Sequence, residues 1–239
     1  MNKRMVVFAP HPDDETLGCG GTIARKITEG YDVFVVFMTD GRNALSRKFN
    51  ITMDPTPHRM KKIRKNEAGE AADVLGIRRE NLFFLDFEDG NLTKSVREAS
   101  AKVLDIMNRI CPDEVFFPQR WEENPDHRGT HFIVETVIQK LRLEPTTYQY
   151  VIAWPIPLSL LTRFQIGLPL KLITSFSNLR LASFDISRFL FLKKLAIKQY
   201  RSQVNLISKA QKTPVVDGFM LKRFLQQDES FFTENQGST

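Results

Sequence analysis

The sequence predicts an α/β fold with a mostly parallel sheet and helices on both faces. Three observations predict it. Short apolar segments alternate with longer segments of helical spacing over residues 4–154, the apolar segments are rich in β-branched and aromatic residues, and glycine follows two of the helical segments. Such alternation favours parallel strands joined by crossover helices. With 239 residues, 42% of them apolar and 26% charged, the chain can bury the core of such a domain.

The first half of the chain is expected to supply three strands and two helices. Arg4–Ala9 is a short apolar run, typical of a buried parallel strand. Leu17–Gly30 has helical spacing and ends at a glycine, a normal helix stop. Asp32–Thr39 is rich in β-branched and aromatic residues and predicts a second buried strand. After a polar loop, His58–Leu75 is a charged helix, and Asn81–Phe87 is the third strand.

The same alternation continues over the next part of the chain. Thr93–Ile110 and Asp126–Leu143 are expected to be helices, and Glu114–Pro118 and Tyr148–Trp154 to be the fourth and fifth strands. The familiar arrangement of such units is Rossmann-like, with strand order 3-2-1-4-5. We therefore expect strands one and four to be neighbours in the sheet.

The pattern changes past Trp154. Pro155–Phe184 is apolar, interrupted by prolines and without clean periodicity. A long helix over Ser187–Ala210, a short helix over Gly218–Gln227 and a polar tail are expected after it. We therefore predict a single domain of residues 1–239, with an α/β core of residues 1–154 and a C-terminal extension of residues 155–239 packed on that core.

Charge and cysteine content limit the classes of function. Two cysteines do not make a disulfide framework, and no apolar stretch reaches the length of about eighteen residues that a transmembrane helix needs, so we expect a cytoplasmic protein. Of the 34 Lys and Arg residues, ten lie between Pro155 and Lys212, where Asp185 is the only acid; the remainder has 24 basic and 27 acidic residues. This basic segment favours an anionic substrate or surface, or else a solvated basic helix face. No nucleic-acid partner is expected.

The loop after the first strand gathers ionisable side chains. His11, Asp13, Asp14 and Glu15 follow that strand directly, at the sheet edge where ligands of open α/β sheets bind. Several acids within a few ångströms raise one another's pKa values unless a cation compensates. A divalent metal would do so. His11 and Asp14 can bind one ion from the same turn while Asp13 stays free.

The loop after the fourth strand offers a third ligand. It contains Asn124, Asp126 and His127 at the start of a helix, and the expected strand order brings it to the loop that carries His11. Two histidines and one carboxylate, with one position open for water, are typical of a catalytic zinc site. The alternative is a structural role for each motif, with Asp14 as a helix cap and His127 as a surface residue.

The two motifs together resemble a known family. PHPDDETLGCGG after strand one and NPDHRGTH after strand four are similar to the PIG-L/LmbE-like zinc-dependent N-deacetylases. The resemblance implies one Zn²⁺ per chain, held by His11, Asp14 and His127, with Asp13 as general base. It also implies hydrolysis of an N-acyl group, most often acetyl, from an amino sugar or a glycan or lipid-linked sugar precursor.

Further site residues are expected around this centre. Glu15 is expected to anchor the loop, and Asp126 to orient a histidine ring. Many relatives have histidine where this chain has Asn124, which can donate a hydrogen bond to an oxyanion but cannot act as an acid. Arg120 or His131 are the alternatives for that role and are expected to contact substrate. Arg42 and Asp40, after strand two, are expected to hold a phosphate or a sugar hydroxyl, with an exposed loop arginine as the alternative for Arg42.

Two other classes of function stay open at this point. One is a non-catalytic domain that binds a glycan or nucleotide sugar and has lost turnover, which Asn124 makes conceivable. The other is an interaction protein whose segment from Pro155 to Lys212 docks peripherally on the inner membrane surface. That segment could instead form a homo-oligomer contact or a lid over the substrate cleft.

Overall fold

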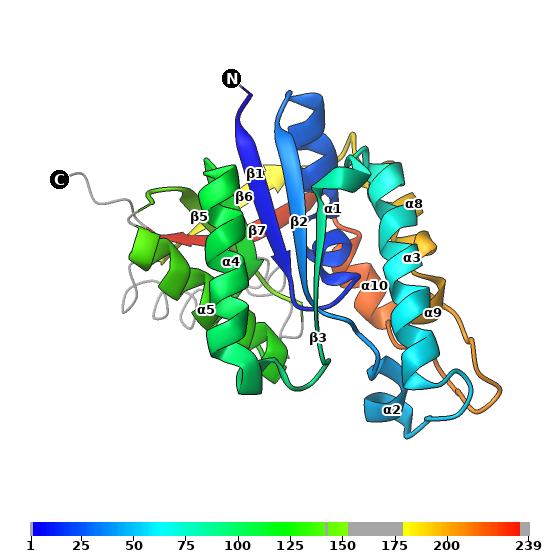
Figure 1. Cartoon of the computed structure of the whole chain (residues 1–239). Helices are drawn as coiled ribbons and strands as arrows, with labels where there is room; N and C mark the ends of the chain where they lie inside the picture. Colours follow the sequence, from blue (N-terminus) through cyan, green and yellow to red (C-terminus); the bar gives the residue numbers. More distant parts are fainter. Residues whose placement is uncertain (1, 142, 153–178, 235–239) are drawn as a thin grey trace.

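The computed structural model describes residues 2–141, 143–152 and 179–234. Seven strands form one sheet in the order β3-β2-β1-β4-β5-β7-β6 (Figure 1). The strands are β1 (Arg4–Ala9), β2 (Asp32–Thr39), β3 (Leu82–Phe87), β4 (Glu114–Pro118), β5 (Thr146–Tyr150), β6 (Leu179–Asp185) and β7 (Asp228–Glu234). The first five are parallel, which confirms the predicted α/β class and the predicted order 3-2-1-4-5.

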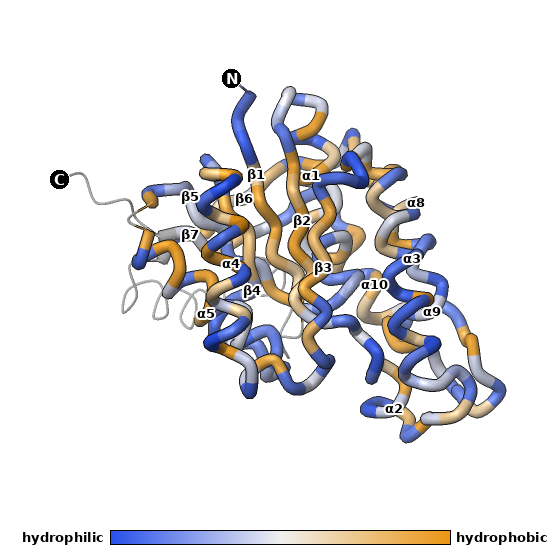
Figure 2. The backbone as a smooth tube through the Cα atoms, in the orientation of Figure 1, coloured by the Kyte–Doolittle hydropathy of each residue, from blue (hydrophilic) through white to orange (hydrophobic). Residues whose placement is uncertain are grey.

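Helices lie on both faces of the sheet, as the sequence predicts. They are α1 (Asp14–Thr28), α2 (Ala44–Phe49), α3 (Pro57–Leu75), α4 (Val96–Ile110), α5 (Pro125–Leu141), α8 (Leu190–Gln199), α9 (Arg201–Val204) and α10 (Gly218–Phe224), with 3-10 helices at Arg79–Asn81 and Leu92–Ser95. Figure 1 shows α4 and α5 on one face and α1, α3 and α8 on the other. Each helical layer lies over the buried strands that Figure 2 shows as the most hydrophobic part of the chain.

The sheet has an apolar core on each face, because successive side chains of a strand point to opposite faces. Met5 and Val7 of β1 face the core beneath α1, α3 and α8, whereas Val6 and Phe8 face the core beneath α4 and α5. All four side chains are fully buried. A strand buried on both faces is a continuous apolar run, which is why β1, β2 and β4 have the bounds that the sequence predicts.

Glycines let α1 approach its neighbours closely. A methyl group added at Gly21 would lie 2.4 Å from Cδ1 of Ile186, and one added at Gly18 would lie 2.8 Å from the ring of Tyr150. Side chains at these positions would separate α1 from β5 and from the turn after β6. The glycine cluster of the first motif therefore serves packing, and the packing fixes the helix whose first turn carries the site.

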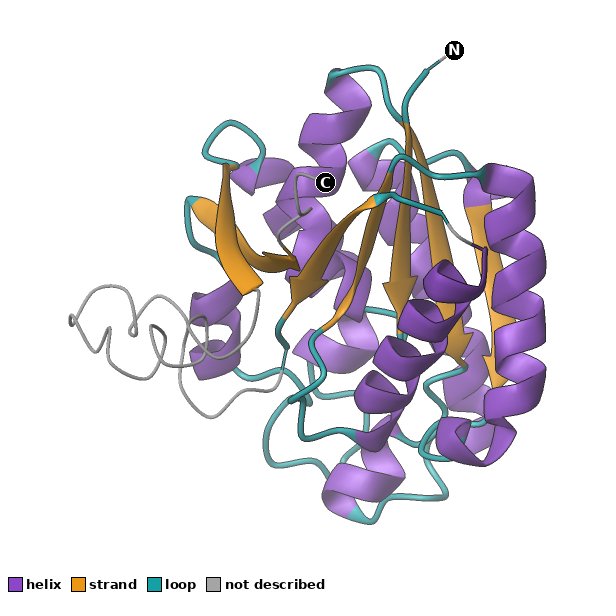
Figure 3. Cartoon of the chain, turned by 90° about the vertical axis from the view of Figure 1, so that its left-hand side faces the viewer, coloured by secondary structure: helices purple, strands orange, loops and turns teal. Residues whose placement is uncertain are grey.

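Two strands of the C-terminal part were not predicted. β7 runs antiparallel to both β5 and β6 and lies between them, so residues expected to be irregular or a polar tail extend the sheet. Figure 3 shows these strands at the edge of the sheet. The prediction failed because β7 is largely polar, with Phe231 and Phe232 buried at its centre.

Several boundaries also differ from the prediction. The long helix expected over Ser187–Ala210 is broken at Tyr200, whose ψ of 57° is not helical, into α8 and α9. α2 occupies a stretch expected to be loop, and α1 begins three residues earlier than expected because the carbonyl of Asp13 accepts a hydrogen bond from the N–H of Leu17. β5 ends at Tyr150, four residues before the expected end.

The apolar half of the segment predicted to contact a membrane, a subunit or the cleft lies outside the described residues. Residues 153–178 fall in that group, so the membrane, oligomer and lid hypotheses stay predictions. Among the residues that the structure does describe, no helix combines the length and the apolar character that a bilayer crossing requires.

Candidate metal centre and active-site pocket

The two predicted loops meet at the carboxyl ends of β1 and β4. These strands are paired in parallel, with Met5 opposite Glu114 and Val7 opposite Phe116. The chain leaving β1 carries His11 and then Asp14 at the start of α1, and α5 carries His127 in its first turn. All three side chains are buried.

Three ligand atoms converge at this point. Oδ2 of Asp14 lies 3.1 Å from Nδ1 of His11 and 3.2 Å from Nε2 of His127, and the two ring nitrogens lie 3.3 Å apart. Burial lowers the pKa of His127, but Asp14 and Glu122 raise it more, to about 9. Burial raises the pKa of Asp14, but the two imidazoles hold it well below its usual range. The three groups therefore attract positive charge strongly, and a divalent cation can replace the protons that the imidazoles would otherwise bind.

The outer nitrogens of both rings face carboxylates. Nε2 of His11 lies 3.2 Å from Oδ2 of Asp126 and 3.4 Å from Oδ1 of Asp89. The Asp126 carboxylate also accepts hydrogen bonds from the N–H groups of Gly90 (2.6 Å) and Leu92 (3.2 Å). His11, Asp89 and Asp126 form a second group that could hold a cation, but Asp126 is already bound by these backbone donors. A carboxylate placed in this way behind a histidine can fix the orientation of a metal-binding ring.

His127 has a similar neighbour. Its Nδ1 lies 3.5 Å from Oε2 of Glu122, a distance for an ion pair and longer than a good hydrogen bond. Glu122 is buried, and its other oxygen accepts a hydrogen bond from the N–H of Ile152. Both candidate ligand histidines thus have a carboxylate behind them.

Asp13 lies beside the convergent atoms in an unusual backbone conformation. Its φ of 137° falls in a region that non-glycine residues seldom adopt. Nη2 of Arg64 lies 2.6 Å from Oδ1 of Asp13 and also donates to the carbonyl of Pro12. Burial raises the pKa of Asp13 to about 7, opposed by Arg64 and helped by Asp14. A carboxylate with a pKa near neutrality is suited to accept and return a proton.

Glu15 holds the backbone of this loop. Its Oε2 accepts a hydrogen bond from the N–H of Asp13 at 3.1 Å, and its Oε1 accepts from the hydroxyls of Thr16 and Tyr200, each at 2.5 Å. The carboxylate is 2% exposed. The structure therefore places Glu15 where it can anchor the loop.

Asn124 caps α5. Its Oδ1 accepts a hydrogen bond from the N–H of Asp126 at 2.9 Å, which satisfies one of the free donors at the helix start. The residue also lines the pocket that contains the three convergent side chains. Its oxygen is used by the helix, so its amide N–H₂ is the group that can face a substrate.

The pocket beside the convergent atoms has a volume of about 380 Å³, within the ~300–1,000 Å³ typical of small-molecule sites. Gln203, from α9, lines it and is 1% exposed; its Oε1 has no hydrogen-bond partner among the described residues. Arg47, from α2, also lines the pocket, 3.4 Å from Asp89. The other lining residues are His11, Asp13, Asp14, Leu17, Asn43, Ala44, Lys48, Arg64, Asp89, Asn124, His127, Ile152, Val215, Val216 and Met220.

Four predicted substrate residues do not line this pocket. Arg42 pairs with Asp40 at the carboxyl end of β2, and Lys61 lies 3.6 Å from the same carboxylate. Nδ1 of His131 lies 3.0 Å from the carbonyl of Pro118, and Arg120 lies 3.7 Å from Glu135. Their contact with substrate stays a prediction.

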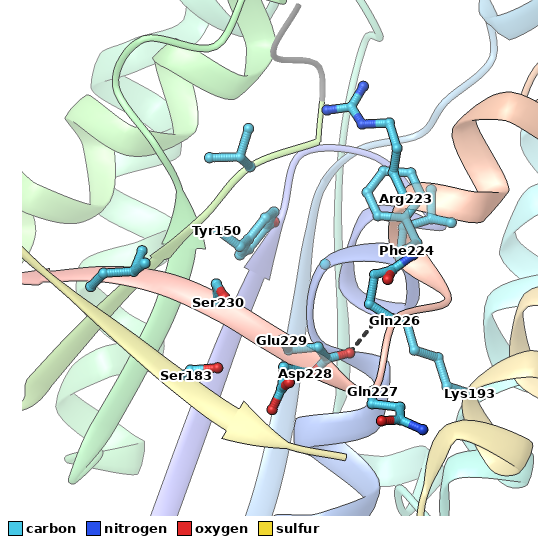
Figure 4. Close-up of a pocket in the computed structure, with 14 residues that line it drawn as sticks. Tyr150, Ser183, Lys193, Arg223, Phe224, Gln226, Gln227, Asp228, Glu229 and Ser230 are labelled. Atoms are coloured by element: carbon cyan, nitrogen blue, oxygen red, sulfur yellow. Dashed lines mark hydrogen bonds and ion pairs between the residues drawn. The ribbon is translucent and has the colours of Figure 1, made fainter. Parts of the chain in front are cut away.

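A second cavity of about 480 Å³ lies on the other side of Leu17, between α1, β7 and α10 (Figure 4). At its floor Nζ of Lys193 donates to Glu229 at 2.6 Å. The Glu229 carboxylate also accepts hydrogen bonds from the N–H groups of Gly21 and Thr22 in α1. These buried charges are therefore paired with one another and with the backbone, and they tie β7 and α8 to α1.

Sequence reasoning assigned no role to Arg64, Asp89, Glu122 or Tyr200. Arg64 lies among the lysines of α3, so composition gives no sign that it alone turns inward. Its 3% exposure and its contact with Asp13 are visible only in the folded chain. Helical spacing is a signal that could have found it, because it puts Arg64 and the buried Glu67 on one face of α3.

The sequence around this site matches a known protein family. The family model described as PIG-L, GlcNAc-PI de-N-acetylase, matches residues 6–138, more than half of the chain. The chain belongs to the PIG-L family. The matched residues include the three convergent side chains and Asp13, so the resemblance stated from the two motifs is confirmed.

Two named deacetylases are similar in sequence to part of this chain. The chain is 30% identical over 134 residues to the diacetylchitobiose deacetylase of Thermococcus kodakarensis, which covers 55% of this chain and 47% of that enzyme. It is 27% identical over 158 residues to a probable N-acetyl-alpha-D-glucosaminyl L-malate deacetylase 2 of Bacillus cereus, covering 64% and 69%. The chain thus spans about half the length of the first of these relatives.

A solved structure shares the fold. The N,N'-diacetylchitobiose deacetylase of Pyrococcus horikoshii superimposes with a TM-score of 0.61 at 26% identity, over 84% of this chain and 70% of that one.

Proposed function

We propose that this chain is a zinc-dependent hydrolase that removes an N-acetyl group from an amino sugar. The observation that carries the proposal is the convergence of His11, Asp14 and His127 beside Asp13 in one pocket. Two imidazoles and one carboxylate leave a coordination position open, as catalytic zinc sites do. The deacetylases among the relatives support the acetyl group and the sugar.

A bound zinc ion would supply a water of lowered pKa and would polarise the amide carbonyl. The residues around it have separate tasks. Asp13 accepts the proton of the attacking water and returns it to the departing amine nitrogen, for which a pKa of about 7 is suitable. Asp126 and Glu122 hold the rings of His11 and His127 in place.

Two amide side chains are assigned to the substrate. The N–H₂ of Asn124 is proposed to donate a hydrogen bond to the oxygen that becomes negative as the carbonyl is attacked. The unpartnered Oε1 of Gln203 offers an acceptor for a hydroxyl or N–H of the sugar. An acceptor buried in this way costs free energy until a donor reaches it, which favours a ligand rich in hydroxyl groups.

Release of free amine from a panel of N-acetyl compounds tests the proposal. The panel contains N-acetylglucosamine, diacetylchitobiose, an N-acetylglucosaminyl malate, a nucleotide sugar, a lipid-linked sugar and N-acetyl-lysine as a non-sugar control. We expect zinc-dependent release from at least one sugar and none from N-acetyl-lysine. The Asp13→Asn variant serves as the inactive control because it keeps the size of the side chain. Zinc-loaded protein that releases amine from none of the sugars would refute the function.

A further inference from the structure

The junction between α8 and α9 reaches the loop that carries Asp13. Tyr200 lies at this junction, where the helix breaks, and its side chain is 1% exposed. Its hydroxyl donates to Oε1 of Glu15 at 2.5 Å, across 185 positions of the chain. A buried tyrosine hydroxyl needs such a partner, and here the partner is a buried carboxylate.

Glu15 links Tyr200 to Asp13 through hydrogen bonds. The carboxylate that accepts from Tyr200 also accepts, through Oε2, from the N–H of Asp13 at 3.1 Å. Asp13 needs such support because its φ of 137° is unfavourable for a non-glycine residue. Without a fixed acceptor for its N–H group, the backbone would relax and move the side chain.

The same junction is fixed to the helix that holds the Asp13 carboxylate. The N–H and the hydroxyl of Ser202 donate to Glu67 of α3 at 2.8 and 2.6 Å. Arg64, one turn earlier on α3, contacts Oδ1 of Asp13. The junction therefore touches both supports of Asp13: Glu15 for its backbone and α3 for its side chain.

We propose that Tyr200 is a positioning residue for Asp13, which it holds through Glu15 in the orientation that the reaction requires. This inference rests on the proposed function, in which Asp13 is the general base. A side chain that only fills the core would contribute through its ring alone. In this arrangement the hydroxyl contributes separately, because it fixes the carboxylate that binds the Asp13 N–H group.

Tyr200→Phe removes only the hydroxyl and tests this role. We expect kcat on the best sugar substrate to fall roughly 10–100-fold, the range for a misplaced catalytic group, with KM and zinc content unchanged. Tyr150→Phe is the matched control: its side chain is also 1% exposed, and its hydroxyl donates to the carbonyl of Phe8 in β1. We expect this control to keep the wild-type kcat.

A double-mutant cycle separates positioning from general stability. If Tyr200 acts through Asp13, then adding Tyr200→Phe to Asp13→Asn lowers the residual activity no further. A multiplicative loss in the double variant would overturn the proposal. Equal losses of kcat in Tyr200→Phe and Tyr150→Phe would overturn it as well.

Hydrogen exchange of the Asp13 amide, followed by NMR, tests the linkage without activity. Protection of this amide should decrease in Tyr200→Phe and not in Tyr150→Phe, and unchanged protection overturns the proposal. If the wild-type protein releases no amine, the proposed function fails while this measurement still decides the linkage. If Tyr200→Phe does not fold, Glu15→Gln replaces it, because a carboxamide N–H₂, which cannot accept, takes the place of one of the two oxygens that accept from Tyr200 and Asp13. The same loss of protection is then expected.

Discussion

The two parts of the chain contribute differently to the site. The first part, residues 4–150, carries the three convergent side chains and Asp13 on loops that follow β1 and β4. The second part, residues 179–234, carries none of these; it lines the pocket with residues such as Gln203 and contacts the loop of Asp13 through the hydrogen bond from Tyr200 to Glu15. The groups proposed to perform the chemistry thus lie in the first part, and the second part contributes pocket-lining residues and contacts that support the site. Substitutions in the two parts should therefore have separable effects.

His127→Ala tests the first part most severely. The variant should lose bound zinc, and activity should fall by more than the ~10²–10⁴-fold that loss of a general base costs, because both the ion and its water are lost. Metal analysis after dialysis against a chelator measures the loss. His58→Ala, which removes an exposed histidine at the start of α3, is the control. Stoichiometric zinc in His127→Ala would remove this residue from the centre.

Asp13→Asn should separate chemistry from metal binding within the same loop. The amide cannot accept the water proton, so we expect kcat to fall by ~10²–10⁴-fold with zinc content kept. Amine release and metal content, measured on one preparation, check both statements. A turnover close to that of the wild type would show that another group is the base.

In the second part, Lys193→Met should lower the stability of the fold and leave kcat unchanged. It leaves the buried Glu229 without its cation, which costs about 3–5 kcal/mol of the free energy of unfolding. Lys194→Met, at the exposed neighbouring position, should change stability by less than about 0.5 kcal/mol. Urea unfolding measures both, and kcat per folded molecule should stay unchanged. Equal stabilities of the two variants would contradict the importance of the buried pair.

Asn124 caps α5 and is also the proposed donor to the oxyanion, so two substitutions are needed to separate these roles. Asn124→Ala removes the helix cap and the amide donor, whereas Asn124→Asp keeps a capping oxygen, removes the donor and adds a negative charge. If the amide stabilises the oxyanion, both variants lose about 10²-fold in kcat, and only the alanine variant also loses stability. Thermal unfolding and steady-state kinetics distinguish the two effects. A loss of stability without a loss of kcat in Asn124→Ala would leave the cap as its sole role.

The features that could be predicted from the sequence lie mainly in the first part of the chain. β1, β2 and β4 are continuous apolar runs, and their bounds follow from burial on both faces of the sheet. The meeting of His11 with His127 follows from the strand order together with two short motifs. Such features depend on neighbouring residues and on one rule of topology, so they are accessible without a structure.

Features that depend on distant partners were missed. β7 has a polar sequence and is a strand because β5 and β6 lie on either side of it. The helix break at Tyr200 follows no proline or glycine, but it brings the side chain to Glu15, 185 positions earlier. Arg64 is distinguished from the lysines around it by its burial and by its contact with Asp13. Local propensity contains no information about partners of this kind.

The position of β7 has a consequence for synthesis on the ribosome. β7 is made after every other described strand, yet it lies between β5 and β6 in the finished sheet. During translation β6 emerges before the strand with which it pairs, and β5 waits with one edge uncovered. The five parallel strands can assemble co-translationally, whereas the last two can join only after residue 234 has left the exit tunnel. Nascent chains stalled shortly before that point would expose two strand edges, the kind of surface that chaperones bind and that otherwise promotes aggregation.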